Sequence, residues 1–486
     1  MSRGPAPHRC VQPDPRRAEP GAPRALLPPK ASSCGVVARL STRTGDLLVN
    51  RPSLLALLVV LLTAPVGRAL AAQPSTVLGA LDGLYPELDI FYRDLHQNPE
   101  LSFQEEKTAA KLAERLRKLG FDVTTGVGGT GVVALLRNGP GPTVMLRTDL
   151  DGLPMEEKTG LPYASKVTVK NGEGQTVSVM HACGHDVHMT VWLGTATLLS
   201  KKKDQWRGTL MLVGQPAEEI GAGARKMLAD GLFKRFPKPD FAVALHNTTA
   251  APAGRVEYVS GYAMAHVDSV DITLYGKGGH GAYPHTTVDP IVMAARTVLA
   301  LQSVVSREKH PLEPGVITVG SIQGGTKHNI IPDEVRLQLT VRSYKPEVRK
   351  ALLDGIDRVA KAEALASGAP RPPKVEVTEG TPATYNDPAL TRRLTDAVVR
   401  VLGEKNVGEA QPVMGGEDFS EYGRAGVPAV MLWLGAVEPQ RFTQSRSGGE
   451  PLPSLHSSGF IPDRERTLRT GVTALTTSAM ELLGKP

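Results

Sequence analysis

The sequence predicts an α/β protein in which a main domain with a mixed central sheet is interrupted by a smaller inserted α+β domain. Short apolar runs alternate with helix-like stretches along most of the chain, which is typical of an α/β sheet. Between residues 263 and 372 the order changes to strand, helix, strand, strand, helix. The 486 residues, 41% hydrophobic and 22% charged, suit two or three domains and exclude a disordered chain, a collagen-like fibre and a multi-span membrane protein.

Residues 1–72 are expected to be an N-terminal extension followed by a secretory signal. The apolar run at 54–62 follows Arg51 and precedes small residues at 69–72, as in the three regions of a signal peptide. The run is too short for a comfortable membrane span, so we expect export to the periplasm or the medium, with a membrane anchor as the alternative. Because a long Pro- and Arg-rich stretch precedes the run, we expect translation to start near residues 47–49.

The formal charge of +7 at first suggests a nucleic-acid or membrane partner. Residues 1–72 hold ten basic and three acidic residues, however, so of the 56 basic and 49 acidic residues 46 of each remain in 73–486. A neutral body with 5% aromatic residues offers no footprint for a phosphate backbone, and we expect no nucleic-acid partner. Cys10 and Cys34 lie in the N-terminal region, so the mature chain keeps Cys183 alone and no internal disulfide.

The first part of the main domain is expected over residues 73–262, and the second part over 373–486. Ser102 and Glu105 have the spacing of a capping box, which predicts a helix start. Its apolar face and terminal glycine follow at Leu112, Leu116, Leu119 and Gly120. Strands are expected at 131–136, 143–146, 209–213, 241–245 and 429–434, and helices at 190–200, 223–229 and 390–402. Functional side chains gather beyond the carboxyl ends of such strands, and these ends carry Asp149, Asp151, Glu218, Glu219 and His246.

The inserted domain is expected over residues 263–372. Its pattern predicts strands at 267–274, 315–322 and 334–342, a glycine-rich turn at 276–281, and helices at 290–304 and 346–366. Gly261 and the proline-rich stretch at 370–373 bound it.

The densest group of possible metal ligands lies at residues 180–188, which read Met-His-Ala-Cys-Gly-His-Asp-Val-His. Cys183 and His185 can place a thiolate and an imidazole on one transition metal. Each residue taken singly is more often structural, but three histidines and a cysteine within residues 181–188 favour a metal site.

Two adjacent carboxylates, Glu218 and Glu219, follow an apolar strand. Their repulsion makes the pairing costly unless cations compensate or one carboxyl group carries a proton. Beside a metal, one can coordinate while the other accepts a proton from an activated water. The alternative is a solvated helix start, where acidic residues favour the positive end of the dipole.

His246 ends another apolar strand, and His456 lies near the C-terminus. Each alone is more often structural. Together with Cys183, His185 and Glu219 they make five potential ligands, which is enough for two metal ions if one ligand or a hydroxide bridges.

Seven stretches, in order along the chain, match one known family. They are Asp-Leu-His-Gln-Asn-Pro-Glu-Leu at 94–101, Arg-Thr-Asp-Leu-Asp-Gly-Leu-Pro at 147–154, the cluster at 181–188, Gln-Pro-Ala-Glu-Glu at 215–219, Gly-Gly-His-Gly-Ala-Tyr-Pro-His at 278–285, Asn-Ile-Ile-Pro at 329–332 and Gly-Gly-Glu-Asp-Phe at 415–419. Through them the chain resembles the aminoacylase and carboxypeptidase superfamily of two-metal hydrolases. The resemblance is to its amidohydrolase subgroup, which contains hippurate hydrolases and plant indoleacetyl-amino-acid hydrolases.

By position, the resemblance implies that Glu218 is the general base. It implies that the metal ligands are Cys183, His185, Glu219, His246 and His456. Where the peptidase branch has a histidine ligand in its His-x-Asp-x-x-Pro motif, this chain has Asp149, a departure shared with the amidohydrolase subgroup. The cofactor implied is a divalent metal, two ions per subunit, with zinc or manganese expected and cobalt as a further option.

The resemblance also gives the insertion a role as a ferredoxin-like lid that often serves as a dimerisation surface, so we expect a homodimer or higher homo-oligomer. His280 is similar to the lid histidine that stabilises the oxyanion, a task for a preorganised donor. Asn329 is expected to contact substrate, and Arg342 to bind the substrate carboxylate in a forked ion pair. The alternatives are a turn residue for His280 and a solvated strand end for Arg342.

We therefore expect hydrolysis of the amide bond of an N-acyl amino acid or a related small conjugate, by metal-activated water with Glu218 as general base. One alternative is a carboxypeptidase or dipeptidase of the same superfamily, which needs only a different pocket. The other is a catalytically inactive binding protein, since a fold can be retained after its catalytic site has been lost. Loss of a metal ligand or of Glu218 would have favoured the inactive protein, and none is lost.

Overall fold

The structure is a computed structural model that describes residues 78–485. The signal sequence expected within residues 1–72 lies outside the described residues. No helix within residues 78–485 is long and apolar enough to cross a membrane.

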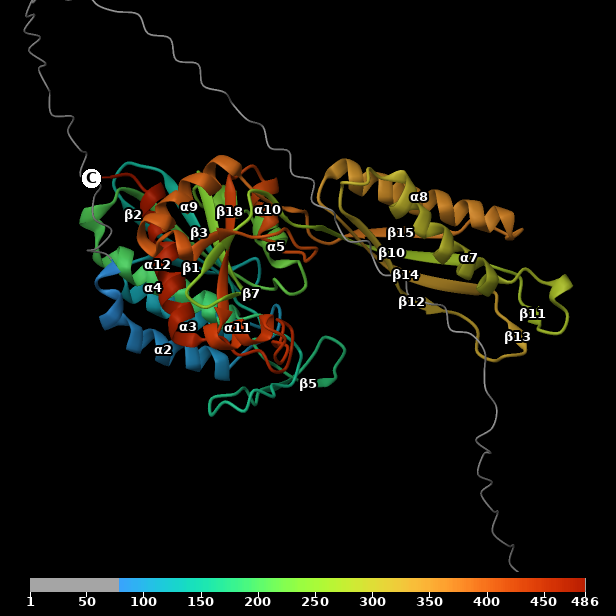
Figure 1. Cartoon of the computed structure of the whole chain (residues 1–486), viewed down its shortest axis with the longest axis horizontal. Coiled ribbons are helices and arrows are strands. Elements are labelled where there is room, and N and C mark those ends of the chain that lie inside the picture. Colours follow the sequence, from blue (N-terminus) through green and yellow to red (C-terminus); the bar gives the residue numbers. More distant parts are fainter. Residues whose placement is uncertain (1–77, 486) are drawn as a thin grey trace, which may run out of the picture. The chain divides into compact units, whose positions relative to one another are not determined.

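An eight-stranded sheet forms the centre of the main domain, with the order β1-β2-β6-β3-β7-β18-β8-β17. Figure 1 labels β1, β2, β3, β7 and β18 of this sheet. Strands β6, β3, β7 and β18 run parallel, whereas β2 is antiparallel to both of its neighbours, so the sheet is mixed, as predicted. The strands are β1 Asp122–Val127, β2 Gly131–Asn138, β3 Thr143–Asp149, β6 Gly208–Gln215, β7 Phe241–Pro252, β8 Val256–Tyr258, β17 Val407–Glu409 and β18 Ala429–Val437. Each of the five apolar runs predicted as main-domain strands lies within one of these elements.

Helices cover both faces of this sheet, because its central strands carry apolar side chains on both sides. The helices against one face are α2 (Leu81–Gln97), α3 (Glu106–Lys118), α4 (His185–Lys201), α9 (Pro388–Leu402) and α12 (Arg464–Leu482). The helices against the other face are α5 (Gly223–Ala229), α6 (Leu232–Arg235) and α10 (Ser420–Arg424). Neighbouring residues of β6 divide accordingly, with Leu212 in the first apolar cluster and Val213 in the second.

Helix α4 is the most enclosed helix of the main domain, and residues 185–199 are all buried. Gly194 lets it approach its neighbours closely, since a Cβ there would lie 2.7 Å from Val472 of α12 and 2.9 Å from Leu88 of α2. The helix is therefore fixed on several sides. His185, the first residue of α4, is therefore held by a rigid helix.

The inserted region forms a separate antiparallel sheet in the order β12-β14-β10-β15. Its strands are β10 His266–Tyr275, β12 Gly315–Gln323, β14 Glu334–Ser343 and β15 Lys374–Glu379. Helices α7 (Pro290–Ser303) and α8 (Pro346–Ala366) pack on it through their own apolar cluster. The order βαββαβ and the strand arrangement are ferredoxin-like, as expected.

Strand β15 lies beyond residue 372, where we expected the insertion to end, and we predicted no strand there. Its sequence, Lys-Val-Glu-Val-Thr-Glu, follows the proline-rich stretch and is mostly polar, because an edge strand needs apolar side chains on one face only. The remaining short elements are β4 Thr168–Lys170, β5 Thr176–Ser178, β9 Gly261–Met264, β11 Gly279–His280, β13 Ile330–Ile331, β16 Thr384–Asn386 and α11 Pro439–Arg446.

The capping box predicted at Ser102 and Glu105 is wrong. Helix α3 begins at Glu106, and neither side chain caps it. Ser102 instead donates a hydrogen bond to Asp151 Oδ2 at 2.6 Å, and Glu105 accepts one from the Ala217 N–H at 2.8 Å. The motif was misread because buried tertiary partners outcompeted the local helix end.

Candidate metal centre and active site

The candidate site lies at one edge of the main sheet, where neighbouring parallel strands end. Strands β6, β3 and β7 are adjacent and parallel, so the loops that follow them meet at the same edge. Asp149 is the last residue of β3, Glu218 and Glu219 follow β6, and His246 lies within β7.

The structure brings the thiol, two of the imidazoles and one carboxylate together. Cys183 Sγ lies 3.5 Å from His246 Nε2 and 3.2 Å from His456 Nε2. His456 Nε2 in turn lies 3.3 Å from Glu219 Oε2. They fall into two candidate metal-binding groups that share the thiol, one of Cys183, His185 and His246 and the other of Cys183, Glu219 and His456.

His185 joins this group from the start of α4. Its Nε2 lies 3.7 Å from a carboxylate oxygen of Glu218 and 3.7 Å from one of Glu219. Its Nδ1 donates to the main-chain oxygen of Asp151 at 2.8 Å. This hydrogen bond fixes the ring with Nε2 facing the carboxylates, where that atom could bind a metal ion.

His246 is oriented in the same way, because its Nδ1 donates to the Asn247 main-chain oxygen at 2.8 Å. Burial, with His188 adding to it, lowers the pKa of His246 to about 3. Burial also lowers the pKa of His456. Both rings are therefore neutral near pH 7, which is the form that binds metals.

Two backbone features set the ligand positions. Gly184 precedes α4 with φ +80°, and a Cβ there would lie 2.0 Å from Asn247 Nδ2, so no other residue fits between Cys183 and His185. His456 itself has φ +57°, an uncommon conformation for a residue with a side chain.

The site carries more negative charge than its own cations balance. Burial, reinforced by Glu417 and Glu219, raises the pKa of Glu218 well above its usual range. Burial and Asp151 raise the pKa of Glu219 to about 7, although His185 opposes the shift. Carboxyl groups that resist ionisation this strongly indicate a place where bound cations would supply the missing positive charge.

Two buried ligand atoms that form no hydrogen bond would be satisfied by such cations. His185 Nε2 and Glu219 Oε1 are buried and accept or donate no hydrogen bond within residues 78–485. Burial raises the pKa of the Cys183 thiol well above its usual range, and a bound divalent ion is what would hold it as a thiolate. The donor set of thiol, imidazoles and carboxylates suits divalent transition metals, and neighbouring groups of three ligands leave room for more than one ion.

A buried arginine supports the site, and sequence reasoning assigned it no role. Arg147 Nη1 lies 2.7 Å from Asp149 Oδ2, and its Nη2 lies 2.8 Å from Glu417 Oε1 and 3.1 Å from Asp418 Oδ1. Its Nε donates to Gln215 at 3.0 Å. The signal was an arginine within an apolar strand, because a buried guanidinium requires buried carboxylate partners.

A second missed network surrounds His96. Both ring nitrogens face carboxylates, with Nδ1 2.6 Å from Asp186 and Nε2 3.0 Å from Glu157. Burial disfavours the charged ring, but the hydrogen bonds to Asp186 and Glu157 prevail and raise the pKa of His96 to about 10. Since Asp186 follows His185, this cation anchors the start of α4 to α2 and to the loop that carries Glu157.

The three residues expected from the lid are placed on the inserted domain rather than in the ligand group. His280 is exposed, and its Nδ1 accepts a hydrogen bond from the Ala282 N–H at 3.0 Å. Asn329 is also exposed. Arg342 is half-buried, its Nε donates to Thr340 at 3.0 Å, and it forms no ion pair with the residues that the structure describes.

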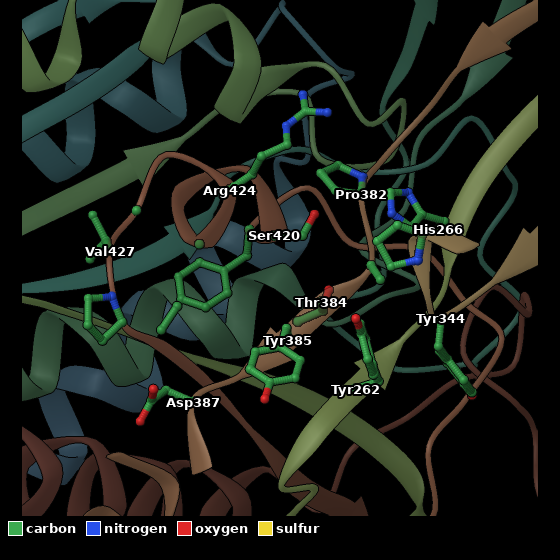
Figure 2. A pocket seen from close by; sticks show the side chains of 17 residues that line it. Tyr262, His266, Tyr344, Pro382, Thr384, Tyr385, Asp387, Ser420, Arg424 and Val427 are labelled. Carbon is green, nitrogen blue, oxygen red and sulfur yellow. The ribbon is translucent and has the colours of Figure 1, made fainter. Parts of the chain in front are cut away.

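A cavity of about 520 Å³ lies elsewhere, beside strands β9 and β16. Figure 2 shows that Tyr262, Tyr344, Tyr385 and His266 are among the side chains around it. Since none of the expected ligands lines this cavity, we assign it no part in hydrolysis.

Comparison with known proteins agrees with this chemistry. Residues 145–447 match the family described as peptidase family M20/M25/M40. The chain is 38% identical over 398 residues to thermostable carboxypeptidase 2 of Saccharolobus solfataricus, which covers 81% of this chain and 94% of the relative. It is 35% identical over 377 residues to IAA-amino acid hydrolase ILR1-like 4 of Arabidopsis thaliana, with 77% and 80% covered.

The fold is similar to that of the Bacillus subtilis YXEP protein, described as a dinuclear metal binding peptidase of the M20 family. The TM-score is 0.69 at 30% sequence identity, and the match covers 83% of this chain and 99% of the other. The family resemblance seen in the sequence is thereby confirmed.

Proposed function

Because the chain belongs to peptidase family M20/M25/M40 and is a metal-dependent hydrolase of amides, we propose that it cleaves the amide bond of N-acyl amino acids or related small conjugates. The products are a carboxylic acid and a free amino acid. Hippurate-like and indoleacetyl conjugates are the first candidates, since a plant relative is named for the hydrolysis of such a conjugate.

One observation carries the proposal. The Cys183 thiol lies within 3.5 Å of both His246 Nε2 and His456 Nε2, and it belongs to two candidate metal-binding groups that also include His185 and Glu219. Glu218 is 9% exposed and lies beside His185 and Glu219, which places its carboxyl group next to the candidate metal ligands.

In the proposed reaction the bound metal, Glu218 and Arg147 have separate roles. A divalent cation supplies Lewis acidity toward water and the amide carbonyl when bound. Glu218 takes a proton from the attacking water and returns it to the leaving amine. Arg147 holds Glu417 and Asp418 beside Glu218 and keeps that carboxyl group within a structured wall.

The lid residues complete the substrate site in this proposal. The Ala282 N–H occupies His280 Nδ1, which leaves the proton of the neutral ring on Nε2 and makes that atom a donor for the developing oxyanion. Arg342 has a half-buried guanidinium whose terminal nitrogens are available for the substrate carboxylate. Asn329 contributes a further polar contact.

The test is a substrate panel of N-acetyl, N-benzoyl and indoleacetyl amino acids together with dipeptides, each assayed with zinc, manganese or cobalt. Hydrolysis of the acyl amino acids over the dipeptides supports the proposal. Preference for peptides would favour a carboxypeptidase or dipeptidase, the alternative that the Saccharolobus relative supports. If the metal-loaded protein hydrolyses none of these substrates, the remaining alternative is a catalytically inactive binding protein.

We also propose that the protein is a homodimer or higher homo-oligomer through its lid. Apolar side chains are exposed on α7 at Ile291, Val292 and Leu299 and on the edge strand β12 at Ile322. Light scattering should give a multiple of the subunit mass for the wild type, and Leu299→Glu should lower it. A monomeric wild type would contradict this proposal.

Export remains part of the proposal. A mature chain that begins near residue 73 is expected in the periplasm or the medium. N-terminal sequencing of the native protein tests both the cleavage and the start near residues 47–49, because recovery of any residue from 1–46 would contradict the start.

A further inference from the structure

The turn that carries Glu218 and Glu219 is held by its main chain. Three successive N–H groups donate to buried carboxylates. The Ala217 N–H bonds Glu105 Oε1 at 2.8 Å, and those of Glu218 and Glu219 bond the two oxygens of Asp151 at 3.1 Å each. Successive N–H groups aimed at anions in this way fix the path of the backbone.

Ala217 requires such a constraint. Its φ is +51°, in the left-handed region that a residue with a side chain rarely adopts. The side chain is fully buried, so it cannot relax into solvent. A partner that binds the Ala217 N–H offsets this strain in the folded state.

The Glu105 side chain is the partner that binds the Ala217 N–H. It is completely buried, the Thr130 hydroxyl donates to its Oε2, and the Ala217 N–H donates to its Oε1. It precedes α3 but makes no capping hydrogen bond there. Its side-chain hydrogen bonds within the described chain go to Thr130 and Ala217 and to none of the expected metal ligands.

We propose that Glu105 is a positioning residue for the general base: by holding the main chain of Ala217 in its left-handed conformation, it sets the direction in which the Glu218 side chain leaves the turn. This inference rests on the proposed role of Glu218. Asp151 holds the N–H groups of Glu218 and Glu219 themselves, so the separate contribution of Glu105 is to the residue before them.

Glu105→Ala and Glu105→Gln separate this role from simple support of the fold. The alanine leaves the Ala217 N–H buried without a partner, whereas the glutamine keeps an acceptor oxygen in the same place. We expect Glu105→Ala to lower kcat by at least about tenfold with KM changed less than about twofold. Metal content by elemental analysis should equal that of the wild type, and Glu105→Gln should retain more than about half of kcat.

Glu100→Ala is the matched control. The Glu100 carboxylate binds the N–H groups of Lys107 at 3.2 Å and Thr108 at 2.8 Å, in the same segment but away from the turn. This variant should lose thermal stability and keep kcat.

Wild-type kcat in folded Glu105→Ala would overturn the proposal. So would a loss of metal in proportion to the loss of activity, because the effect would then act through Glu219. If Glu105→Ala does not fold, Thr130→Val decides, since it removes only the hydroxyl group bound to Glu105. Lowered kcat at full metal content supports the proposal, and unchanged kcat overturns it. Failure of the proposed function shows itself differently, as an inactive wild type or a fully active Glu218→Ala variant.

Discussion

Arg147 and Asp149 form an ion pair of 2.7 Å within one strand, and both side chains are completely buried. The other oxygen of Asp149 accepts a hydrogen bond from His188 Nδ1 at 2.8 Å. Asp149 stands where the peptidase branch has a histidine ligand, yet both of its oxygens already have partners. Asp149 therefore links the buried Arg147 to His188 beside the candidate ligands.

Replacement of Arg147 tests that support. Arg147→Leu would leave Asp149, Glu417 and Asp418 buried without their cation, and we expect it to lower the free energy of unfolding by about 3–5 kcal/mol. Chemical denaturation measures the change. The control is Arg137→Ala on β2 of the same sheet, whose exposed pair with Asp122 at 3.5 Å should contribute less than about 1 kcal/mol. Equal effects of the two variants would contradict the role assigned to Arg147.

Replacement of the general base should separate chemistry from metal binding. Glu218→Ala is expected to lower kcat by about a hundredfold or more, because it removes the proton acceptor while the ligands Cys183, His185 and Glu219 stay in place. Elemental analysis of the same preparation should find wild-type metal content. A fully active variant would remove Glu218 from the mechanism.

Replacement of the thiol should act on the metal itself. Cys183→Ala removes the atom that lies within 3.5 Å of both His246 Nε2 and His456 Nε2, so metal occupancy and activity should fall together. Cys183→Ser serves as the comparison with nearly unchanged volume. Metal content equal to that of the wild type in both variants would make Cys183 an inert core residue.

Replacement of the lid histidine should spare metal and fold. His280→Ala is expected to lower kcat by about ten- to a hundredfold through loss of an oxyanion donor. His285→Ala, which changes another exposed histidine of the same domain, is the control and should keep wild-type kcat. Turnover by His280→Ala equal to that of the control would reject the oxyanion role.

The His96 network predicts how stability depends on pH. The folded protein raises the pKa of His96 to about 10 from 6.5, so between these pH values the folded chain holds a proton that the unfolded chain releases. The stabilisation is complete below pH 6.5 and is lost as pH rises toward 10. His96→Gln should therefore flatten the fall in unfolding free energy across this window, as followed by urea denaturation. An unchanged slope would show that His96 is not charged in the folded protein.

The sequence was sufficient for elements whose pattern is local. Helix α8 was predicted with its observed bounds, because Pro346 starts it and its apolar residues keep the helical period. It was insufficient where distant partners decide the structure. Ser102 and Glu105 have the spacing of a helix cap, but their partners, Asp151 and Ala217, come much later in the chain.

The same limit applied to the site. Cys183, His185 and the two glutamates were recognisable as ligand types near strand ends, and the structure brings them together with His246 and His456. The partners of Arg147 were not recognisable, because Glu417 lies 270 positions away and nothing in the local pattern links the two. A charged residue within an apolar strand, such as Arg147, is the sequence signal that indicates a buried network of this kind.

His456 approaches the Cys183 thiol across 273 positions of sequence, and the whole inserted domain lies between them. Nearly the entire polypeptide must therefore be synthesised before His456 can approach Cys183. A chain that ends before residue 456 consequently lacks the imidazole that lies 3.2 Å from the Cys183 thiol.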